Sequence, residues 1–288
     1  MILTEIMSFD FSNIFIVLVI IIAFAIRFSS TNEYKKKNVP QLDLLKSNYE
    51  KGLPDEIKAA LEKYFVFYRN LHPNEKIRFE RRTAAFYADK VFLDENRNEL
   101  DDGLALMVSA SAVQLTFGMK DFLLLHFRRV KVFPRPYSMP MIPTTFKGHV
   151  TEDGSVFLAW DSFAEGYSDP QDGTNLGLHE WTHALEVNNH FYNNQKFRKD
   201  FHDWEVSAIE EMKKMRAGQS KFLRSYGMQN EHEMFSVCVE FFFERTEEFA
   251  TRLPTVYEEM KTLLNQNPLK KEDPVVEKDF NDHEIFVG

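Results

Sequence analysis

The sequence has 288 residues, of which 44% are hydrophobic and 27% are charged, and these values favour one sizeable folded domain. The formal net charge of -9 excludes the overall basic surface of a nucleic-acid-binding protein, so we expect no nucleic-acid partner. A single cysteine, Cys238, cannot form an internal disulfide, which favours a reducing compartment.

An apolar segment near the N-terminus predicts a membrane anchor. Residues 11–26 contain no charge, and residues 14–26 are apolar throughout. This length is close to that of a membrane-spanning helix, and the flanking residues do not match the main alternative, a cleaved signal peptide. Basic residues follow the segment, which by the positive-inside tendency places the rest of the chain in the cytoplasm. We expect a single-pass anchor over residues 1–28, then a linker and lead-in over residues 29–52.

Helical periodicity dominates the first part of the domain that follows. Apolar residues recur at helical spacing from residue 53 to about residue 71, and further helices are predicted over residues 74–91 and 100–117. Between residues 130 and 160, short runs rich in Val, Phe and Thr alternate with prolines, which predicts a small antiparallel sheet. Helical periodicity returns from about residue 174, and residues 269–288 are predicted to form a charged flexible tail. The fold class is therefore α+β and mainly helical.

The strand-like run Val156-Phe157-Leu158-Ala159-Trp160-Asp161 ends shortly before the next helix. It is compatible with two roles. An edge strand would accept an extended peptide substrate as an additional strand, whereas a core strand would only support the fold.

The sequence His179-Glu180-Trp181-Thr182-His183 predicts a metal site on a helix. Residues four apart lie on one helical face, so His179 and His183 can bind one metal with Glu180 beside them. Neutral imidazoles hold Zn²⁺ without cancelling its charge, and a glutamate can accept a proton from water that the metal activates. We therefore interpret Glu180 as a general base and expect one Zn²⁺; a surface helix with two histidines is the structural alternative.

A catalytic zinc requires a third protein ligand. The longer motif HExxHxxGxxH fails, because Glu186 and Asn189 replace its glycine and third histidine and His190 is one place off. Acidic residues shortly downstream are one alternative, although such residues usually lie on a solvated helix face: Asp203, Glu205 and Glu210.

Glu233 is the stronger candidate for the third ligand. It begins an unusually apolar helical segment, in which an unpaired carboxylate would be costly unless a metal or a donor meets it. The structural alternative is a capping box, in which Asn230 and Glu233 only satisfy the backbone at the helix start.

Several short segments together resemble the Mlc titration factor A family of zinc-dependent peptidases, which is gluzincin-like and distantly similar to the anthrax lethal factor peptidase domain. The resemblance covers residues 53–268 and is carried by Trp160-Asp161, Asp169-Pro170, Asp172-Gly173, Asn175, His179 to His183, Leu185-Glu186, Tyr226, Glu233-Met234-Phe235 and Glu240 to Phe243. The chain departs from the usual pattern at Trp181-Thr182 and at Glu186, where aspartate is usual. These departures leave the expected metal ligands unchanged.

The resemblance implies a zincin-like metallopeptidase domain in which His179, His183 and Glu233 hold the zinc. It also implies that Tyr226 lies at the site, where a phenol hydroxyl can donate to the oxyanion of a tetrahedral intermediate. The resulting hypothesis is a membrane-anchored peptidase with a peptide or protein substrate. The alternative is a membrane-tethered binding module that sequesters a regulatory protein partner, with the zinc serving a structural role.

Overall fold

Helices and a small sheet form the part of the chain that the computed structural model describes, which is residue 47, residues 50–139 and residues 144–269. These residues belong to one compact unit, Leu42–Gly288. The predicted anchor lies outside the described residues, as do nearly all of the predicted linker and tail. Within the described residues, no helix combines the length and the apolar character needed to cross a bilayer.

The first part of the domain contains the helices α3 (Asp55–Tyr64), α4 (Val66–Asn70), α5 (Pro73–Asp89) and α6 (Asp102–Thr116). The last two confirm the helices predicted over residues 74–91 and 100–117. The prediction of a single helix over residues 53–71 is wrong, because the structure has two helices there, α3 and α4. Phe65 separates them with an extended backbone (φ -98°, ψ 96°). The Phe65 ring is fully buried and stacks on Tyr167 with 3.9 Å between ring centroids. The tertiary contact therefore overrides the local helical pattern.

The main sheet is mixed, so the prediction of a small antiparallel sheet is only partly right. Its strand order is β1-β2-β6-β5, and only β5 runs antiparallel to its neighbour. The strands are β1 (Val91–Leu93), β2 (Arg129–Phe133), β5 (Gly148–Thr151) and β6 (Ser155–Ala159). A separate antiparallel pair consists of β3 (Tyr137–Ser138) and β4 (Thr145–Phe146). Parallel pairing depends on long crossover connections, here one that contains α6, and local sequence patterns do not reveal it.

The β6 strand lies inside the sheet between β2 and β5, so the possible edge-strand role of residues 156–161 is wrong. All five residues of β6 are buried, which is the pattern of a core strand. Trp160 and Asp161 do not extend the strand, because they begin the next helix, α7 (Trp160–Ser168). The end strand on this side of the sheet is β5 instead.

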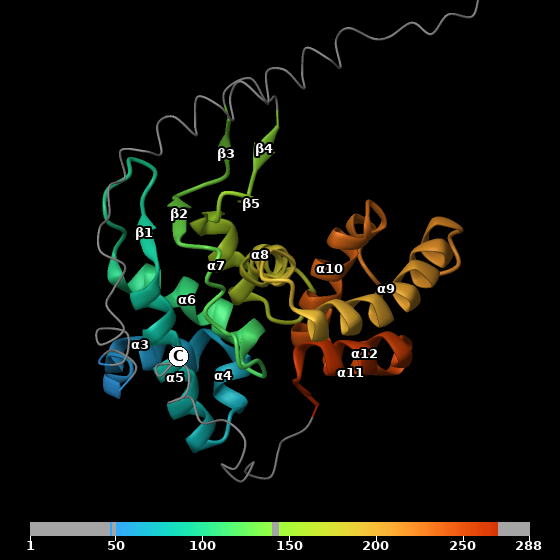
Figure 1. Ribbon diagram of the computed structural model, residues 1–288, viewed down its shortest axis with the longest axis horizontal. Helices are drawn as coiled ribbons and strands as arrows, with labels where there is room; N and C mark the ends of the chain where they lie inside the picture. Colours follow the sequence, from blue (N-terminus) through green and yellow to red (C-terminus); the bar gives the residue numbers. More distant parts are fainter. Residues whose placement is uncertain (1–46, 48–49, 140–143, 270–288) are drawn as a thin grey trace, which may run out of the picture. The chain divides into compact units, whose positions relative to one another are not determined.

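The second half of the domain is helical and packs against the sheet through one central helix. This helix, α8 (Leu176–Phe191), contacts β5 and β6 on one side and α10 (Glu231–Glu244) on the other (Figure 1). The remaining helices are α9 (Gln195–Arg216), α10 (Glu231–Glu244), α11 (Thr246–Arg252) and α12 (Pro254–Leu264), with a short 3₁₀ turn η2 (Ser225–Met228) before α10. The arrangement confirms a mainly helical α+β fold.

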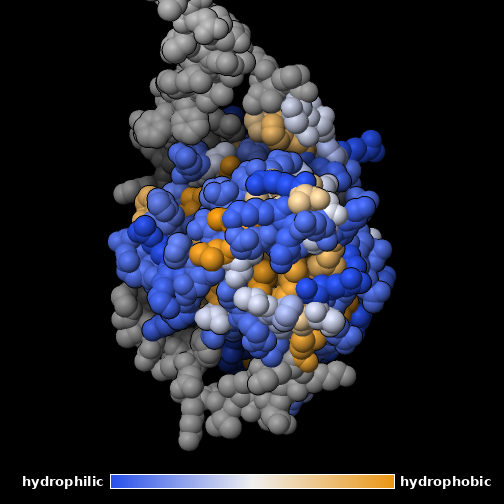
Figure 2. Space-filling view, turned by 90° about the vertical axis from the view of Figure 1, so that its right-hand side faces the viewer, coloured by the Kyte–Doolittle hydropathy of each residue, from blue (hydrophilic) through white to orange (hydrophobic). Residues whose placement is uncertain are grey.

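The amphipathic character of α9 determines which of its faces meets the core. Its buried residues recur at helical spacing, as Phe197, Trp204, Ala208, Met212 and Met215 show. The molecular surface on the side where α9 lies is hydrophilic over most of its area, with scattered apolar patches (Figure 2). Of the acidic residues of α9, Asp203 and Glu210 are exposed, whereas Glu211 is buried.

Candidate metal centre

The sequence before α8 specifies where that helix begins. Asn175 is its N-cap residue, and its side-chain oxygen accepts a hydrogen bond of 3.0 Å from the backbone N–H of Leu178. Gly173 has a φ of +75°, and a Cβ at this position would lie 2.6 Å from the Phe241 ring. Turn chemistry and close packing thus fix the start of α8 one helical turn before His179.

Two imidazoles from the first half of α8 point to one place. His179 and His183 are four residues apart, and their Nε2 atoms lie 3.2 Å from each other. Their side chains are 12% and 18% exposed, so both rings are largely removed from water but remain accessible at the surface. The helix itself therefore supplies two nitrogen donors directed to one point.

Glu233, in the first turn of α10, completes this group. Its Oε2 atom lies 3.1 Å from Nε2 of His179 and 3.5 Å from Nε2 of His183. The same oxygen is buried, and the two imidazole nitrogens face it. One donor atom from each of the three residues lies within 4.8 Å of the others, a spacing at which they can hold a metal ion. Two imidazole nitrogens and one carboxylate oxygen are a donor set found at catalytic zinc sites.

The capping-box alternative for Glu233 describes only half of the observed contacts. Asn230 is the N-cap residue of α10, and its side chain accepts a hydrogen bond of 2.9 Å from the backbone N–H of Glu233. The carboxylate of Glu233 faces the two histidines instead of serving the backbone. The cap therefore fixes the first turn of α10, while the Glu233 side chain remains available for a ligand.

The other acidic candidates lie on α9 and pair with their own helical neighbours. Oδ2 of Asp203 lies 3.4 Å from Nζ of Lys199, and Oε1 of Glu210 lies 2.6 Å from Nζ of Lys213. Oε2 of Glu205 lies 3.4 Å from Nδ1 of His202. None of these three carboxylates belongs to the group formed by the two histidines and Glu233.

The electrostatics of the group favour a positive charge at its centre. Burial opposes ionisation of Glu233, but hydrogen bonding and proximity to His179 and His183 outweigh it and lower the pKa of Glu233 to about 2. Burial also opposes protonation of His179, yet Glu233 and Glu240 outweigh this and raise its pKa to about 10. The site therefore accommodates positive charge at neutral pH, either on an imidazole or on a cation bound between these residues.

Glu180 lies beside the histidines on the side of the sheet. It is 5% exposed, and burial raises its pKa to about 6. Gly148 at the start of β5 approaches it so closely that a Cβ at this position would lie 2.6 Å from Oε1 of Glu180. The sequence analysis missed Gly148, although an isolated glycine at a strand is a known sign of close backbone approach.

Tyr226 lies on the other side of His179, in the turn η2. The centroid of its ring is 5.7 Å from that of the His179 ring, and the residue is 43% exposed. Burial of the hydroxyl group and the charge of Glu233 raise the pKa of Tyr226. The phenol therefore stays protonated at neutral pH and can donate a hydrogen bond.

A second residue that the sequence analysis did not single out for a role is Glu240. Its carboxylate is 1% exposed and its Oε1 atom lies 2.6 Å from Nδ1 of His179. The other oxygen, Oε2, forms an ion pair with Arg224. Sequence alone offers only the weak signal of an acidic residue in an apolar helix, because the contact joins residues 61 positions apart.

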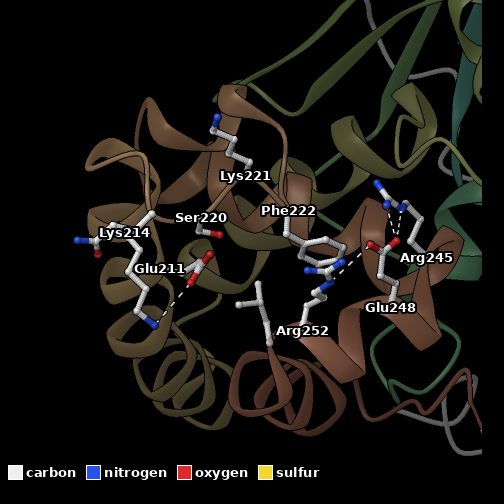
Figure 3. A pocket seen from close by; sticks show the side chains of 10 residues that line it. Glu211, Lys214, Ser220, Lys221, Phe222, Arg245, Glu248 and Arg252 are labelled. Atoms are coloured by element: carbon white, nitrogen blue, oxygen red, sulfur yellow. Dashed lines mark hydrogen bonds and ion pairs between the residues drawn. The ribbon is translucent and has the colours of Figure 1, made fainter.

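A separate hollow of about 490 Å³ lies between the end of α9, residues 219–222 and α11 (Figure 3). Charged side chains of both signs line it, and several are already paired, as in the contacts of Glu211 with Lys214 and of Arg245 with Glu248. It contains none of the residues of the metal group. The chemistry described above therefore belongs to the metal group on α8 and α10 and not to this hollow.

The histidine-bearing helix, the glutamate from a later helix and the adjoining small sheet define a metallopeptidase-like fold. The chain belongs to the glucose-regulated metallo-peptidase M90 family, whose model matches residues 41–264.

Two relatives are similar to this chain over longer segments. The chain is 25% identical over 244 residues to the uncharacterized protein slr2042 of Synechocystis, a match that covers 78% of this chain and 88% of that protein. It is 26% identical over 137 residues to Mlc titration factor A of Yersinia enterocolitica, which covers 44% of this chain and 51% of that protein. The resemblance to the Mlc titration factor A family is thus confirmed.

Proposed function

We propose that this protein is a zinc-dependent peptidase that hydrolyses peptide bonds, with His179, His183 and Glu233 as the zinc ligands. The observation that supports it most strongly is the convergence of these three donor groups, with the buried Oε2 atom of Glu233 at 3.1 Å from Nε2 of His179. Zinc bound there would supply Lewis acidity, which polarises a carbonyl and lowers the pKa of water. The family to which the chain belongs supports the same reaction class.

In this proposal, Glu180 accepts a proton from the attacking water and later delivers it to the leaving amine. A carboxyl group whose pKa is raised toward neutrality suits both steps, and burial raises that of Glu180 to about 6. The Tyr226 hydroxyl donates a hydrogen bond to the oxygen that becomes negatively charged. Its place beside His179 supports this role.

The β5 strand is the proposed binding strand for an extended peptide. It is the end strand of the main sheet, and its first residue, Gly148, contacts Glu180 directly. A peptide that paired with this edge would therefore pass next to the general base.

The proposal also includes the membrane anchor over residues 1–28, with the peptidase domain in the cytoplasm. The uncharged segment 11–26 and the basic residues after it support this part. The full chain should then sediment with membranes and be released by detergent but not by high salt. A chain that stays in the soluble fraction would rule the anchor out.

A second function is a binding module that sequesters a regulatory protein. The name of the Yersinia relative, a titration factor for Mlc, favours it. The two functions differ in their dependence on Glu180, because binding of a protein does not require a general base.

The test uses the full chain in detergent, with native enzyme beside Glu180→Gln and a mixture of peptides as substrate. Glu180→Gln should keep its zinc and lose about 10² to 10⁴-fold in kcat, the range for a general acid or base. If the native chain holds zinc but cleaves no peptide and Glu180→Gln is indistinguishable from it, the binding module is the better description.

A further inference from the structure

Glu240 connects three parts of the metal centre although it lies two helical turns beyond Glu233. Its Oε1 atom lies 2.6 Å from Nδ1 of His179, and its Oε2 atom accepts from Arg224 and, at 3.4 Å, from the backbone N–H of Asn175. The carboxylate therefore contacts the start of α8, the first histidine of the motif and the segment that precedes η2.

The position of Glu240 on α10 explains how it reaches His179. Polar residues 233, 236, 240 and 244 of α10 follow one another at helical spacing on the face that meets α8. Within this stripe, the hydroxyl of Ser236 lies 3.3 Å from the backbone oxygen of His179. The same helix thus presents one carboxylate to Nε2 of His179 and another to its Nδ1.

The contact determines which nitrogen of His179 is available to a metal. Both oxygens of Glu240 accept hydrogen bonds, so the Nδ1 atom of His179 donates its proton to Oε1. Nε2, the atom that faces Glu233 and His183, is then the nitrogen left to bind a metal in place of a proton.

Arg224 holds this carboxylate in place from the opposite side. The ion pair joins α10 to the segment just before η2, only two residues from Tyr226. A carboxylate that is 1% exposed needs such a partner, because an uncompensated buried charge is costly.

We infer that Glu240 is a positioning residue for the metal centre: it fixes the orientation and tautomer of His179, and Arg224 tethers it to the turn that bears Tyr226. This inference rests on the proposed zinc site. Outer carboxylates of this kind typically contribute about 10 to 100-fold to metal affinity.

The experiment measures the zinc dissociation constant of the full chain in detergent by competition with a chromophoric chelator. Glu240→Gln keeps the shape of the side chain but places amide hydrogens against the donors of Arg224 and Asn175. It should weaken zinc binding about 10 to 100-fold. The matched control is Glu244→Gln, the same change one turn later on the same face, where the side chain bonds the amide of Asn175 and not a histidine. The control should bind zinc as the native chain does.

Two further measurements separate positioning from a general structural role. In the zinc-loaded native chain, the proton on Nδ1 of His179 should give a strongly downfield NMR signal, which Glu240→Gln moves upfield and Glu244→Gln leaves in place. Arg224→Met is the second variant in case Glu240→Gln does not fold, because it leaves the carboxylate beside His179 unchanged and alters only its tether, a side chain that is 30% exposed. It should also weaken zinc binding, and the double variant should bind no more weakly than Glu240→Gln alone.

The outcomes distinguish this inference from the proposed function. Native-like zinc affinity in both Glu240→Gln and Arg224→Met overturns the positioning role, even if the native chain cleaves peptides. Weakened affinity in these variants supports it, even if the native chain cleaves none. A native chain that binds no zinc overturns both.

Discussion

Glu233 lies in the first turn of α10, where a carboxylate can serve either the helix or a ligand. Asn230 already satisfies the backbone N–H of Glu233, at 2.9 Å, so the helix does not need the Glu233 side chain. The oxygen that faces the histidines is buried and lies 3.1 Å from Nε2 of His179 and 3.5 Å from Nε2 of His183. A buried acceptor of this kind is costly unless a cation or donor meets it, which is the residue-scale argument for a metal.

Tyr226 provides a prediction at the same scale. Tyr226→Phe removes only the hydroxyl and keeps the ring beside His179, so the fold and zinc content should not change. Loss of one hydrogen bond to the oxyanion should lower kcat about 10² to 10³-fold, with a much smaller effect on KM. Steady-state kinetics with a cleavable peptide would test this, and a kcat equal to the native value would remove Tyr226 from the mechanism.

At the scale of elements, the local patterns of the sequence predicted much of what the structure contains. The spacing of His179 and His183 sufficed to place two imidazoles on one face, because the geometry of a single helix determines it. Three features were beyond local patterns: the break at Phe65, the parallel strands, and the interior position of β6. Each depends on packing between elements that are distant in sequence.

The same distinction applies to the site. Gly148 and Glu240 meet their partners across the interface of α8 with β5 and with α10, respectively. One sequence cannot show which elements are neighbours, so neither contact was foreseeable from spacing.

The contact between β5 and α8 yields an element-scale prediction. In Gly148→Ala the new Cβ would lie 2.6 Å from Oε1 of Glu180, so the strand or the carboxylate must move. A displacement of about 1 Å at a catalytic group can cost about 100-fold in rate. We expect kcat/KM for a peptide to fall by about that factor while zinc content stays native; unchanged kinetics would contradict the close packing of Gly148 on Glu180.

At the scale of the whole molecule, buried carboxylates connect stability to pH. Burial raises the pKa of Glu244 from 4.5 to about 8, and its Oε2 atom has no hydrogen-bond partner. The folded state therefore holds a proton that the unfolded state releases, and the stability that this provides below pH 4.5 is lost as the pH rises toward 8.

Glu244→Gln should remove this loss, because the amide is neutral throughout and can still accept from Asn175. The unfolding free energy of the native chain should fall relative to the variant between pH 5 and pH 8, by up to about 1.4 kcal/mol per pH unit. Urea unfolding at several pH values measures the difference, with the exposed Glu247→Gln as control. Parallel curves for native chain and Glu244→Gln would show that Glu244 is ionised in the folded protein over this range.

The central claim is that one zinc ion is bound by His179, His183 and Glu233, and the most direct measurement is the zinc content of the purified full chain by elemental analysis. The native chain should hold about one zinc ion. Glu233→Ala should lose it, whereas Glu205→Ala, which removes one of the three alternative acids on α9, should retain it. A Glu233→Ala chain that keeps its zinc, or a Glu205→Ala chain that loses it, would contradict the assignment of the third ligand.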